Sequence, residues 1–573
     1  MATKPSTRGL TRGLFDALID RVGGWASGLS SESNNYTVET VGIPLEGEQD
    51  VEFAADLYRP ITKGSPVAST ILVQSPYGPR FPFSFTLARV WAARGYNVLL
   101  VSVRGVFGSG GLHDPARQEV ADGFRVVRWM RKQPWYTGTF ATLGQSYLGF
   151  TQWALMDSGE PLDDYAAAII SAGPHDFSDA AWGTGAMWLP LIDWAENSAV
   201  TESQNWFSSA YSILTANPNG DVAAKKTVPL VDGAKNALGA ESPTYKWLHN
   251  WLTSSETEIK GEGVTEFWKP TQHGRALETT KVPILLVGGW QDIFTEATLH
   301  QYQRLRERGC TVALTIGPWN HMEVGTDLKE AHDWLNKHLA KKVTGEIRQA
   351  PVRINVTGSS QWKWFAIWPP ATKSLELYLN SGGQLTQGLP AGSNPDEVQF
   401  TFDPIDPTPT VGGPLLFNGG YVDDSPLAKR SDVLTFTSLP LDEDIEIHGK
   451  PHLKLLHSSD NPHVDLFVRL SEVNRKGASR NLCQVYRRLN PNRARSDASQ
   501  PVMIELDLSD CAHHFGKGTA IRLLIAGGNF PHYSYNLGSG ENQGTGTTLK
   551  PARHTVHLGG SEGSKLLLPI LEL

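Results

Sequence analysis

The stretch Thr139–Gly149, TFATLGQSYLG, decides the fold. A short apolar run ends at Gly144-Gln145-Ser146, and the apolar, helix-like run YLGFTQWALM begins directly after it. This pattern predicts a strand, a tight turn with a serine at its tip, and a helix. In such a turn the serine has strained backbone geometry, and small residues beside it relieve the crowding.

Ser146 is therefore a candidate nucleophile. The corresponding turn of an α/β-hydrolase exposes a serine Oγ at the edge of a parallel sheet, usually within the pattern G-x-S-x-G. Here the second glycine comes one place later, at Gly149, after Tyr147 and Leu148. A G-x-S triplet also occurs by chance in a long chain rich in glycine, so the assignment depends on the surrounding sequence.

The neighbouring segments alternate between apolar strands and helices. Apolar runs at 69–75 and 97–103 are followed by helical patterns at 84–94 and 116–132, and Tyr165–Ser171 supplies a further strand. Fully apolar strands that alternate with helices are typical of a parallel sheet covered on both faces. Active sites of such sheets lie beyond the carboxyl ends of the strands.

The sequence divides into four parts. Residues 1–178 and 275–346 carry the alternating pattern and predict the two halves of an α/β-hydrolase catalytic domain. Residues 179–274 interrupt it with Trp, Ser and Asn, which predicts a helical insertion, or lid, over the site. In residues 347–573, short strands such as VRINVTG (352–358) are separated by Gly, Pro and Asn, which predicts a C-terminal β jelly roll.

Composition excludes several classes of function. The chain has 573 residues, 40% of them hydrophobic, and no apolar run approaches the roughly 18 residues of a membrane span, so we expect no membrane partner. The net charge of −8, with dispersed basic residues, argues against nucleic-acid binding. Cys310, Cys483 and Cys511 are odd in number and lack metal-ligand spacing. We therefore expect free thiols, no metal and no cofactor.

The N-terminal segment predicts an amphipathic helix. Leu14–Val22 is interrupted by Asp16, Asp20 and Arg21, so it lacks the apolar core of a secretory signal. We expect a cytoplasmic protein, with an organelle-targeting presequence as the alternative.

A serine nucleophile needs a base, and the base needs an orienting acid. In α/β-hydrolases the chain order is Ser, acid, His, each after a strand. Asp292 follows the apolar run ILLVGGWQ, and His321 follows VALTIGPWN. An Asp after a strand is also a common helix cap, and His175-Asp176 follow another strand as a competing pair. Those two are neighbours, which cannot supply acid and base from separate loops, so the triad Ser146, Asp292, His321 is preferred.

Acyl transfer also requires donors for an oxyanion. One candidate is the backbone N–H of Tyr147. The second normally comes from the loop after an early strand, here Ser75-Pro76-Tyr77-Gly78, whose proline has no N–H to offer. The phenol of Tyr77 is the better donor, and a Tyr merely packed at a strand end is the alternative.

Five motifs in order give the sequence a resemblance to a known family. They are Pro76-Tyr77-Gly78, Arg104-Gly105 with Ser109 and Gly111, Gly144-Gln145-Ser146-Tyr147-Leu148-Gly149, Gly289-Trp290-Gln291-Asp292-x-Phe294, and Gly317-Pro318-Trp319-x-His321. Over roughly residues 40 to 573 the chain resembles the cocaine esterase family of serine hydrolases, in the X-prolyl dipeptidyl aminopeptidase and α-amino-acid ester hydrolase group. Members of that family resemble GxSYxG at the elbow, which accounts for the displaced glycine.

The resemblance implies a catalytic α/β domain, an inserted helical domain and a C-terminal jelly roll. It also implies that Ser146, Asp292 and His321 form the triad, with Tyr77 and the Tyr147 amide as the oxyanion hole. The implied substrate is a small-molecule ester or amide. We expect an esterase that forms an acyl-enzyme. The alternatives are an amidase, α-amino-acid ester hydrolase or X-Pro dipeptidyl aminopeptidase, an acyltransferase with the same triad, and a non-enzymatic binding protein. A homodimer is a candidate assembly.

The insertion suggests which acyl group fits. Residues 182–211 are dense in aromatic side chains and are placed to overhang the nucleophile. Most of these rings should form a local core, but we expect Trp188 and Phe294, with Trp182 third, to form an apolar pocket. Family members that bind amino groups carry acidic clusters, whereas here Asp193 and Glu196 are the only carboxylates close by. An apolar wall would favour uncharged, bulky or aromatic acyl groups.

Overall fold

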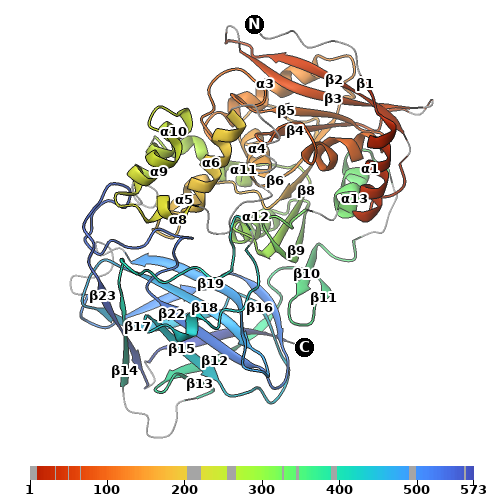
Figure 1. The fold of residues 1–573 in the computed structure, drawn as a ribbon. Helices are drawn as coiled ribbons and strands as arrows, with labels where there is room; N and C mark the ends of the chain where they lie inside the picture. Colours follow the sequence, from red (N-terminus) through yellow and green to blue (C-terminus); the bar gives the residue numbers. More distant parts are fainter. Residues whose placement is uncertain are drawn as a thin grey trace.

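A computed structural model describes most of the chain. The described residues are 10–32, 34–48, 51–62, 64, 66–202, 221–254, 266–325, 328–342, 348–388, 396–417, 419–489, 498–559 and 563–572. Figure 1 shows an α/β domain at the top, a group of helices at its side, and a β domain below both.

The α/β domain is built on one sheet with the strand order β1-β2-β3-β5-β4-β6-β7-β8-β9-β10-β11. The strands are β1 Leu10–Thr11, β2 Asn35–Pro44, β3 Glu52–Ile61, β4 Thr70–Ser75, β5 Asn97–Ser102, β6 Phe140–Gln145, β7 Tyr165–Ser171, β8 Ile284–Gln291, β9 Val312–Asn320, β10 Val352–Val356 and β11 Gln361–Phe365. Pairing is parallel from β5 through β4 to β10 and antiparallel at both edges. The carboxyl ends of the parallel strands therefore meet at one edge.

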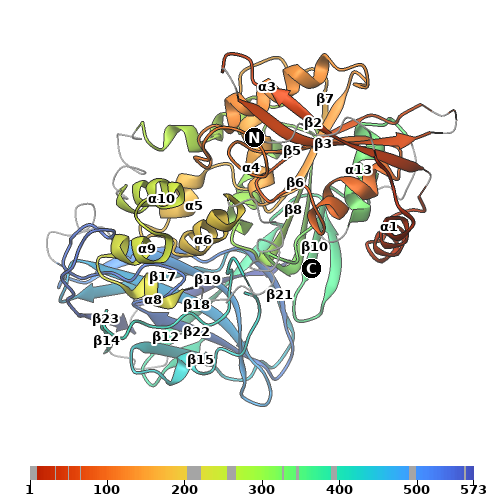
Figure 2. The same cartoon turned by 45° about the horizontal axis from the view of Figure 1, so that its top comes forward.

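Helices cover both faces of this sheet (Figure 2). They are α1 Leu14–Ala26, η1 Phe85–Arg89, α2 Val90–Ala92, α3 Glu119–Arg131, α4 Tyr147–Met156, α12 Thr295–Glu307 and α13 Leu328–His338. Alternate side chains of β5 enter two separate cores: Leu99 packs with Trp153, whereas Val98 and Leu100 pack with Trp91. The continuous apolar strands in the sequence are thus explained by burial on both faces.

The insertion lies between β7 and β8 and is helical, as predicted. Its described elements are α5 Phe177–Trp182, α6 Pro190–Glu202, α8 Val222–Lys226, α9 Leu230–Leu238, α10 Pro243–Thr253, η3 Lys269–Thr271 and α11 Gly274–Thr279. Three of its aromatic residues, Trp206, Phe207 and Tyr211, lie outside the described residues.

The C-terminal domain consists of strands with short connections. They are β12 Thr372–Asn380, β13 Gln384–Thr386, β14 Asp396–Phe402, β15 Val433–Ser438, β16 Ile445–Gly449, β17 His452–Ser459, β18 Val464–Val473, β19 Ser479–Leu489, β20 Val502–Asp507, β21 Cys511–Phe515, β22 Ala520–Ala526, β23 Ala552–Leu558 and β24 Lys565–Leu571, with a short helix η4 Leu427–Lys429. The pairing is antiparallel apart from β13 with β15.

One sequence prediction differs from the structure at the domain boundary. The strand within VRINVTG was expected in the C-terminal domain, but β10 pairs in parallel with β9 of the catalytic sheet. The helix α13 connects these two strands and forms a further strand–helix–strand unit. A single short strand does not reveal its partner in the sequence, so the catalytic sheet extends to Phe365.

Candidate active site

The turn between β6 and α4 holds Ser146 in strained geometry. Its backbone has φ 61° and ψ −124°, in the region that non-glycine residues rarely adopt. The Ser146 amide donates to the Ser171 carbonyl at 2.9 Å, which ties the turn to β7. The half-buried side chain consequently stands at the carboxyl edge of the sheet, as predicted.

Two glycines make this turn possible through close approach. A Cβ on Gly144 would lie 2.3 Å from the Leu148 Cβ, and one on Gly149 would lie 2.5 Å from the Gly173 Cα. Real Cβ atoms do not approach other atoms so closely. The glycine at 149 is therefore required by backbone contact between α4 and the segment after β7, which gives a physical reason for its displaced position.

Ser146, His321 and Asp292 form one hydrogen-bonded chain. The distance from His321 Nε2 to Ser146 Oγ is 3.0 Å, and that from His321 Nδ1 to Asp292 Oδ2 is 2.6 Å. Both His321 and Asp292 are buried. The three side chains thus have the residue types and the order of contacts that a serine hydrolase triad has.

Contacts with the backbone and with one aromatic ring fix Asp292 and His321. Asp292 Oδ1 accepts from the Phe294 amide at 2.6 Å, so this carboxylate also orders the turn into α12. The side-chain amide of Gln145 donates to the His321 carbonyl. The Phe294 ring stands edge-on to the imidazole, with centroids 5.6 Å apart. These contacts hold the imidazole in one orientation.

Tyr77 reaches the same point from the loop after β4. Burial raises the pKa of its phenol, and interactions of the hydroxyl with Ser146, Trp194 and the backbone of Tyr147 oppose that rise. The phenol therefore stays protonated at neutral pH and remains a donor. Its position beside Ser146 and the Tyr147 amide fits the predicted pair of oxyanion donors.

Glu119 is a buried carboxyl that the sequence analysis did not single out. It contacts Tyr147, the residue after Ser146. The Tyr147 hydroxyl donates to Glu119 of α3 and accepts from the Ala116 amide at 2.8 Å. Burial raises the pKa of Glu119 to about 7. The Tyr147 ring stacks on Trp194 of α6 with an interplanar angle of 15°. Nothing in the local sequence pattern signals this contact, because it joins α3, α4 and α6.

The competing pair is structural, as expected. Asp176 accepts from the amides of Ser178 and Asp179 and so caps α5. His175 stacks on His300, with centroids 5.6 Å apart. Neither residue belongs to the hydrogen-bonded chain of Ser146, His321 and Asp292.

A cavity of about 150 Å³ opens beside Ser146. Its lining comes from all three parts of the molecule: Pro76, Tyr77, Phe83, Thr86, Leu87, Gln145, Ser146, Leu148, Trp194, Asn197, Ser198, His321, Met322, Leu416 and Phe417. Leu416 and Phe417 belong to the C-terminal domain, a contribution that the sequence analysis missed. No short-range pattern could have revealed it, since the contact joins distant segments.

The three aromatic residues predicted to contact the substrate lie elsewhere. Trp182, Trp188 and Phe294 are buried in the aromatic core between the insertion and the catalytic domain and are absent from the cavity lining. Trp194 takes the predicted place. It lies on α6 with Asn197 and Ser198 three and four residues later, so these three share one helix face toward the cavity.

Comparison with known proteins identifies the family. The model of the X-Pro dipeptidyl-peptidase (S15 family) matches residues 47–323, and that of the X-Pro dipeptidyl-peptidase C-terminal non-catalytic domain matches residues 346–567. The chain belongs to the S15 family. It is an S15 serine hydrolase with the predicted fold, which is an α/β-hydrolase sheet with a helical insertion and a C-terminal antiparallel β domain. The predicted resemblance to the cocaine esterase family is confirmed.

Proteins that are similar to this chain are named for different activities. A cocaine esterase of Rhodococcus sp. is 26% identical over 94% of this chain and 99% of its own length. An aminopeptidase from a Thaumarchaeota archaeon has a TM-score of 0.75 at 20% identity, covering 94% of this chain and 97% of its own. An α-amino-acid ester hydrolase has a TM-score of 0.74 at 21% identity, covering 95% and 98%. The two structures show the fold alone.

Proposed function

We propose that this S15 serine hydrolase cleaves carboxylic esters with an uncharged, apolar or aromatic acyl group. Ser146 attacks the ester carbonyl while His321 takes its proton, and Asp292 stabilises the imidazolium. Tyr77 and the Tyr147 amide donate to the oxyanion. His321 then protonates the leaving alcohol, and water releases the acid from the acyl-enzyme by the same steps in reverse order.

The observation that carries this proposal is the chemistry of the cavity. None of the described residues that line it is Asp, Glu, Lys or Arg. Burying an ammonium without a counter-charge is very costly, so a free amino group on the acyl part would bind poorly. Apolar cavities of about 150 Å³ hold a benzene ring, and the cavity volume here matches that size.

Three of the apolar lining side chains come from outside the α/β domain. Trp194 approaches from the insertion, and Leu416 and Phe417 approach from the C-terminal domain. Phe294, in contrast, supports the imidazole from outside the lining. We therefore assign acyl-group selection to Trp194 and Phe417.

A second candidate, an α-amino-acid ester hydrolase or aminopeptidase, rests on the two carboxylates of α6. Asp193 and Glu196 precede the lining residues Asn197 and Ser198 on one helix. Asp193, however, accepts from the Lys225 ammonium at 2.6 Å, with both side chains buried. Burial and the nearby Asp193 raise the pKa of Glu196 to about 7, so much of it is uncharged at neutral pH. The ester proposal is therefore preferred.

The test compares kcat/KM for a benzoyl or phenylacetyl ester with that for a phenylglycine ester of the same alcohol at pH 7, beside an X-Pro anilide. We expect the uncharged ester to be preferred by about tenfold or more. A phenylglycine ester that is better by the same factor would instead favour the second candidate. Replacing Phe417 by Ala should raise KM for the bulky ester more than for an acetyl ester.

A further inference from the structure

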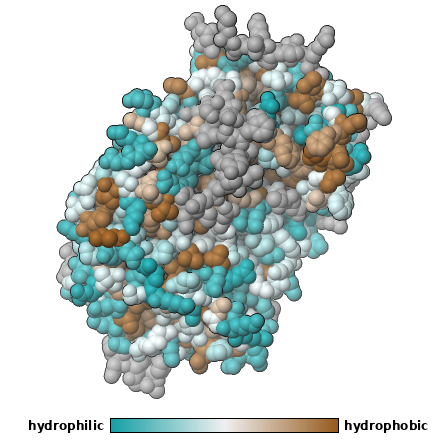
Figure 3. All heavy atoms as spheres, in the orientation of Figure 1, coloured by the Kyte–Doolittle hydropathy of each residue, from teal (hydrophilic) through white to brown (hydrophobic). Residues whose placement is uncertain are grey.

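The N-terminal helix α1 turns its apolar face away from the protein. The exposed fractions are 93% for Leu14, 74% for Phe15, 58% for Leu18, 56% for Val22 and 79% for Trp25. This spacing places all five side chains on one face of a helix. In Figure 3 a hydrophobic patch lies at the right of the view, where Figure 1 places α1. We call these five residues the α1 stripe.

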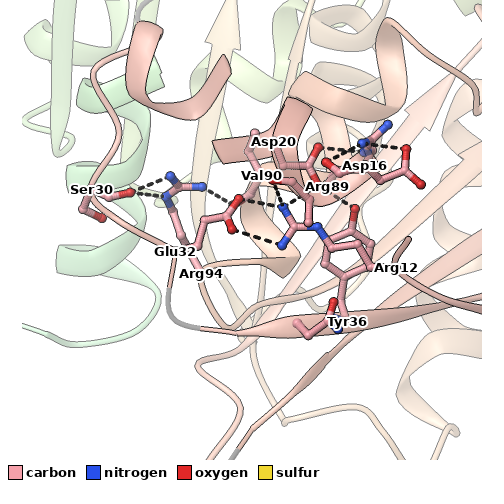
Figure 4. A network of polar contacts seen from close by, with 11 residues as sticks. Arg12, Asp16, Asp20, Ser30, Glu32, Tyr36, Arg89, Val90 and Arg94 are labelled. Carbon is pink, nitrogen blue, oxygen red and sulfur yellow. Dashed lines mark hydrogen bonds and ion pairs between the residues drawn. The ribbon is translucent and has the colours of Figure 1, made fainter. Parts of the chain in front are cut away.

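Ion pairs hold the opposite, polar face of α1 against the catalytic domain. Asp20 is fully buried, 2.8 Å from Arg89 Nε and 2.9 Å from Arg12. Asp16 pairs with the same Arg89 at 2.9 Å, and the Tyr36 hydroxyl donates to Asp20 at 2.8 Å. Figure 4 shows this network between α1, the β2 strand and η1. Both acids of the helix thus pair with arginines, and Asp20 is buried between Arg12 and Arg89.

Close packing also prevents α1 from rotating. A Cβ on Gly23 would lie 2.4 Å from the Phe85 ring, and one on Gly24 would lie 2.9 Å from the Arg94 guanidinium. The two glycines let the helix approach the body on its polar side. The outward direction of the stripe is therefore fixed by the fold.

We propose that the α1 stripe is a docking surface for the phospholipid bilayer. An interfacial helix lies in the membrane plane with its apolar face in the acyl boundary and needs no spanning length. This agrees with the finding that no helix among the described residues could cross a membrane. It revises the expectation of no membrane partner, which considered spanning segments alone. Arg21, exposed at the edge of the stripe, adds a charge suited to anionic headgroups.

The size of the stripe favours a lipid surface over a second copy of the chain. A helix of 13 residues is about 20 Å long and about 10 Å wide, a footprint of about 200 Å². A stable dimer needs about 800 Å² on each partner. A bilayer, in contrast, covers every side chain of the stripe at once. Residues 1–9, MATKPSTRG, contain Met1 as their one large apolar side chain, so they are ill suited to cover it.

The segment that contains η1 lies between α1 and the cavity. Phe85 and Arg89 of η1 contact α1, whereas Phe83, Thr86 and Leu87 line the cavity. A docked bilayer would therefore lie next to the segment that forms one cavity wall. The docking inference stands on α1 alone and is independent of the proposed ester chemistry.

The test is flotation of the full chain with two kinds of vesicle. One contains phosphatidylcholine alone, and the other also contains about 30% phosphatidylglycerol, which gives its surface a negative charge. We expect binding to both, tighter to the anionic vesicles at low salt. The triple variant Phe15→Ser, Leu18→Ser, Trp25→Ser should lower the ratio of bound to free protein by about tenfold or more, since binding scales with buried apolar area.

A matched control removes equally exposed apolar side chains elsewhere. Leu112, Ile405 and Leu439 are 75%, 67% and 77% exposed, and their triple replacement by Ser should leave vesicle binding unchanged. Both variants should hydrolyse a soluble ester at the parental rate, so a failed docking test is distinguishable from a failed activity. Equal binding of the stripe variant and the parent would overturn the proposal. So would a parent that ignores vesicles while the stripe variant turns a dimer into a monomer, which would assign the stripe to a second copy.

Discussion

At the scale of single residues, Ser146, His321 and Asp292 lie in one hydrogen-bonded chain, so the proposed triad should lose its function as a unit. Ser146→Ala and His321→Ala should each lower kcat by about 10⁶, and Asp292→Asn should lower it by about 10⁴ by allowing the wrong imidazole tautomer. Circular dichroism would show whether the fold is retained. Turnover at the parental rate by Ser146→Ala with any substrate would refute the nucleophile assignment.

Tyr77 carries the second prediction at this scale. Tyr77→Phe removes one hydroxyl beside Ser146 and little volume. Loss of one oxyanion donor typically costs roughly 10²–10³ in kcat, so we expect a loss of that size with KM nearly unchanged. The stacked neighbour Phe83, 5.6 Å away, keeps the ring in place in the variant. An unchanged kcat would place the second donor elsewhere.

Glu119 should make stability depend on pH. Burial raises its pKa to about 7, above the ordinary value of 4.5, so the folded protein binds the proton more tightly than the unfolded chain. Its stabilising contribution is complete below about pH 4.5 and is lost as the pH rises through about 7. Relative to Glu119→Gln, the free energy of unfolding should fall by roughly 2–3 kcal/mol between pH 5 and pH 8. Urea unfolding at a series of pH values measures this difference, and parallel profiles would contradict it.

At the scale of elements, the sequence predicted what depends on local pattern. The alternating strands and helices, the elbow and the strand-end positions of Ser146, Asp292 and His321 all follow from residues within one strand and its next turn. The cavity wall did not follow, because the orientation of α6 depends on packing. Trp194 shares a face with Asn197 and Ser198, whereas Trp188 precedes the first residue of α6, Pro190. The partner of β10 was missed for the same reason, since strand pairing is a long-range contact.

The elbow itself gives a prediction for an element. Gly149→Ala adds a Cβ 2.5 Å from the Gly173 backbone, so α4 must shift. Overpacking of this kind costs about 1–3 kcal/mol, and the shift should also lower kcat because α4 begins directly after Ser146. Gly274→Ala is the matched control, since its Cβ would meet no atom within 4 Å. Thermal unfolding and turnover of the two variants check the prediction, and equal behaviour would show that the approach of α4 to Gly173 is not required.

At the scale of the whole molecule, the C-terminal domain contacts the loops that carry Asp292 and His321. The Gln291 side chain, adjacent to the acid, donates to the Leu482 carbonyl at 2.6 Å and accepts from Asn481 at 3.1 Å. Asn320, adjacent to the base, donates to the Gly419 carbonyl at 3.2 Å. The same loop supplies Leu416 and Phe417 to the cavity. The β domain therefore contributes to the cavity and contacts both loops, and we expect its removal to expose the cavity and release them.

Asn481 is the residue through which this coupling can be measured. It is buried, donates to Gln291 and to the Gly420 carbonyl, and accepts from the Val422 amide at 2.6 Å. Asn481→Ala removes the acceptor of the Val422 amide and one donor each from Gln291 and the Gly420 carbonyl. Loss of a buried hydrogen-bond partner typically costs about 1–3 kcal/mol. Because the freed groups flank the acid and the cavity loop, kcat/KM should fall by about tenfold, although Asn481 is outside the lining. The exposed Asn250→Ala on α10 serves as the control for a lost amide. If Asn481→Ala lost stability but kept the parental kcat/KM, the β domain would support folding alone, and the cavity loop would hold its place without the contact to β19.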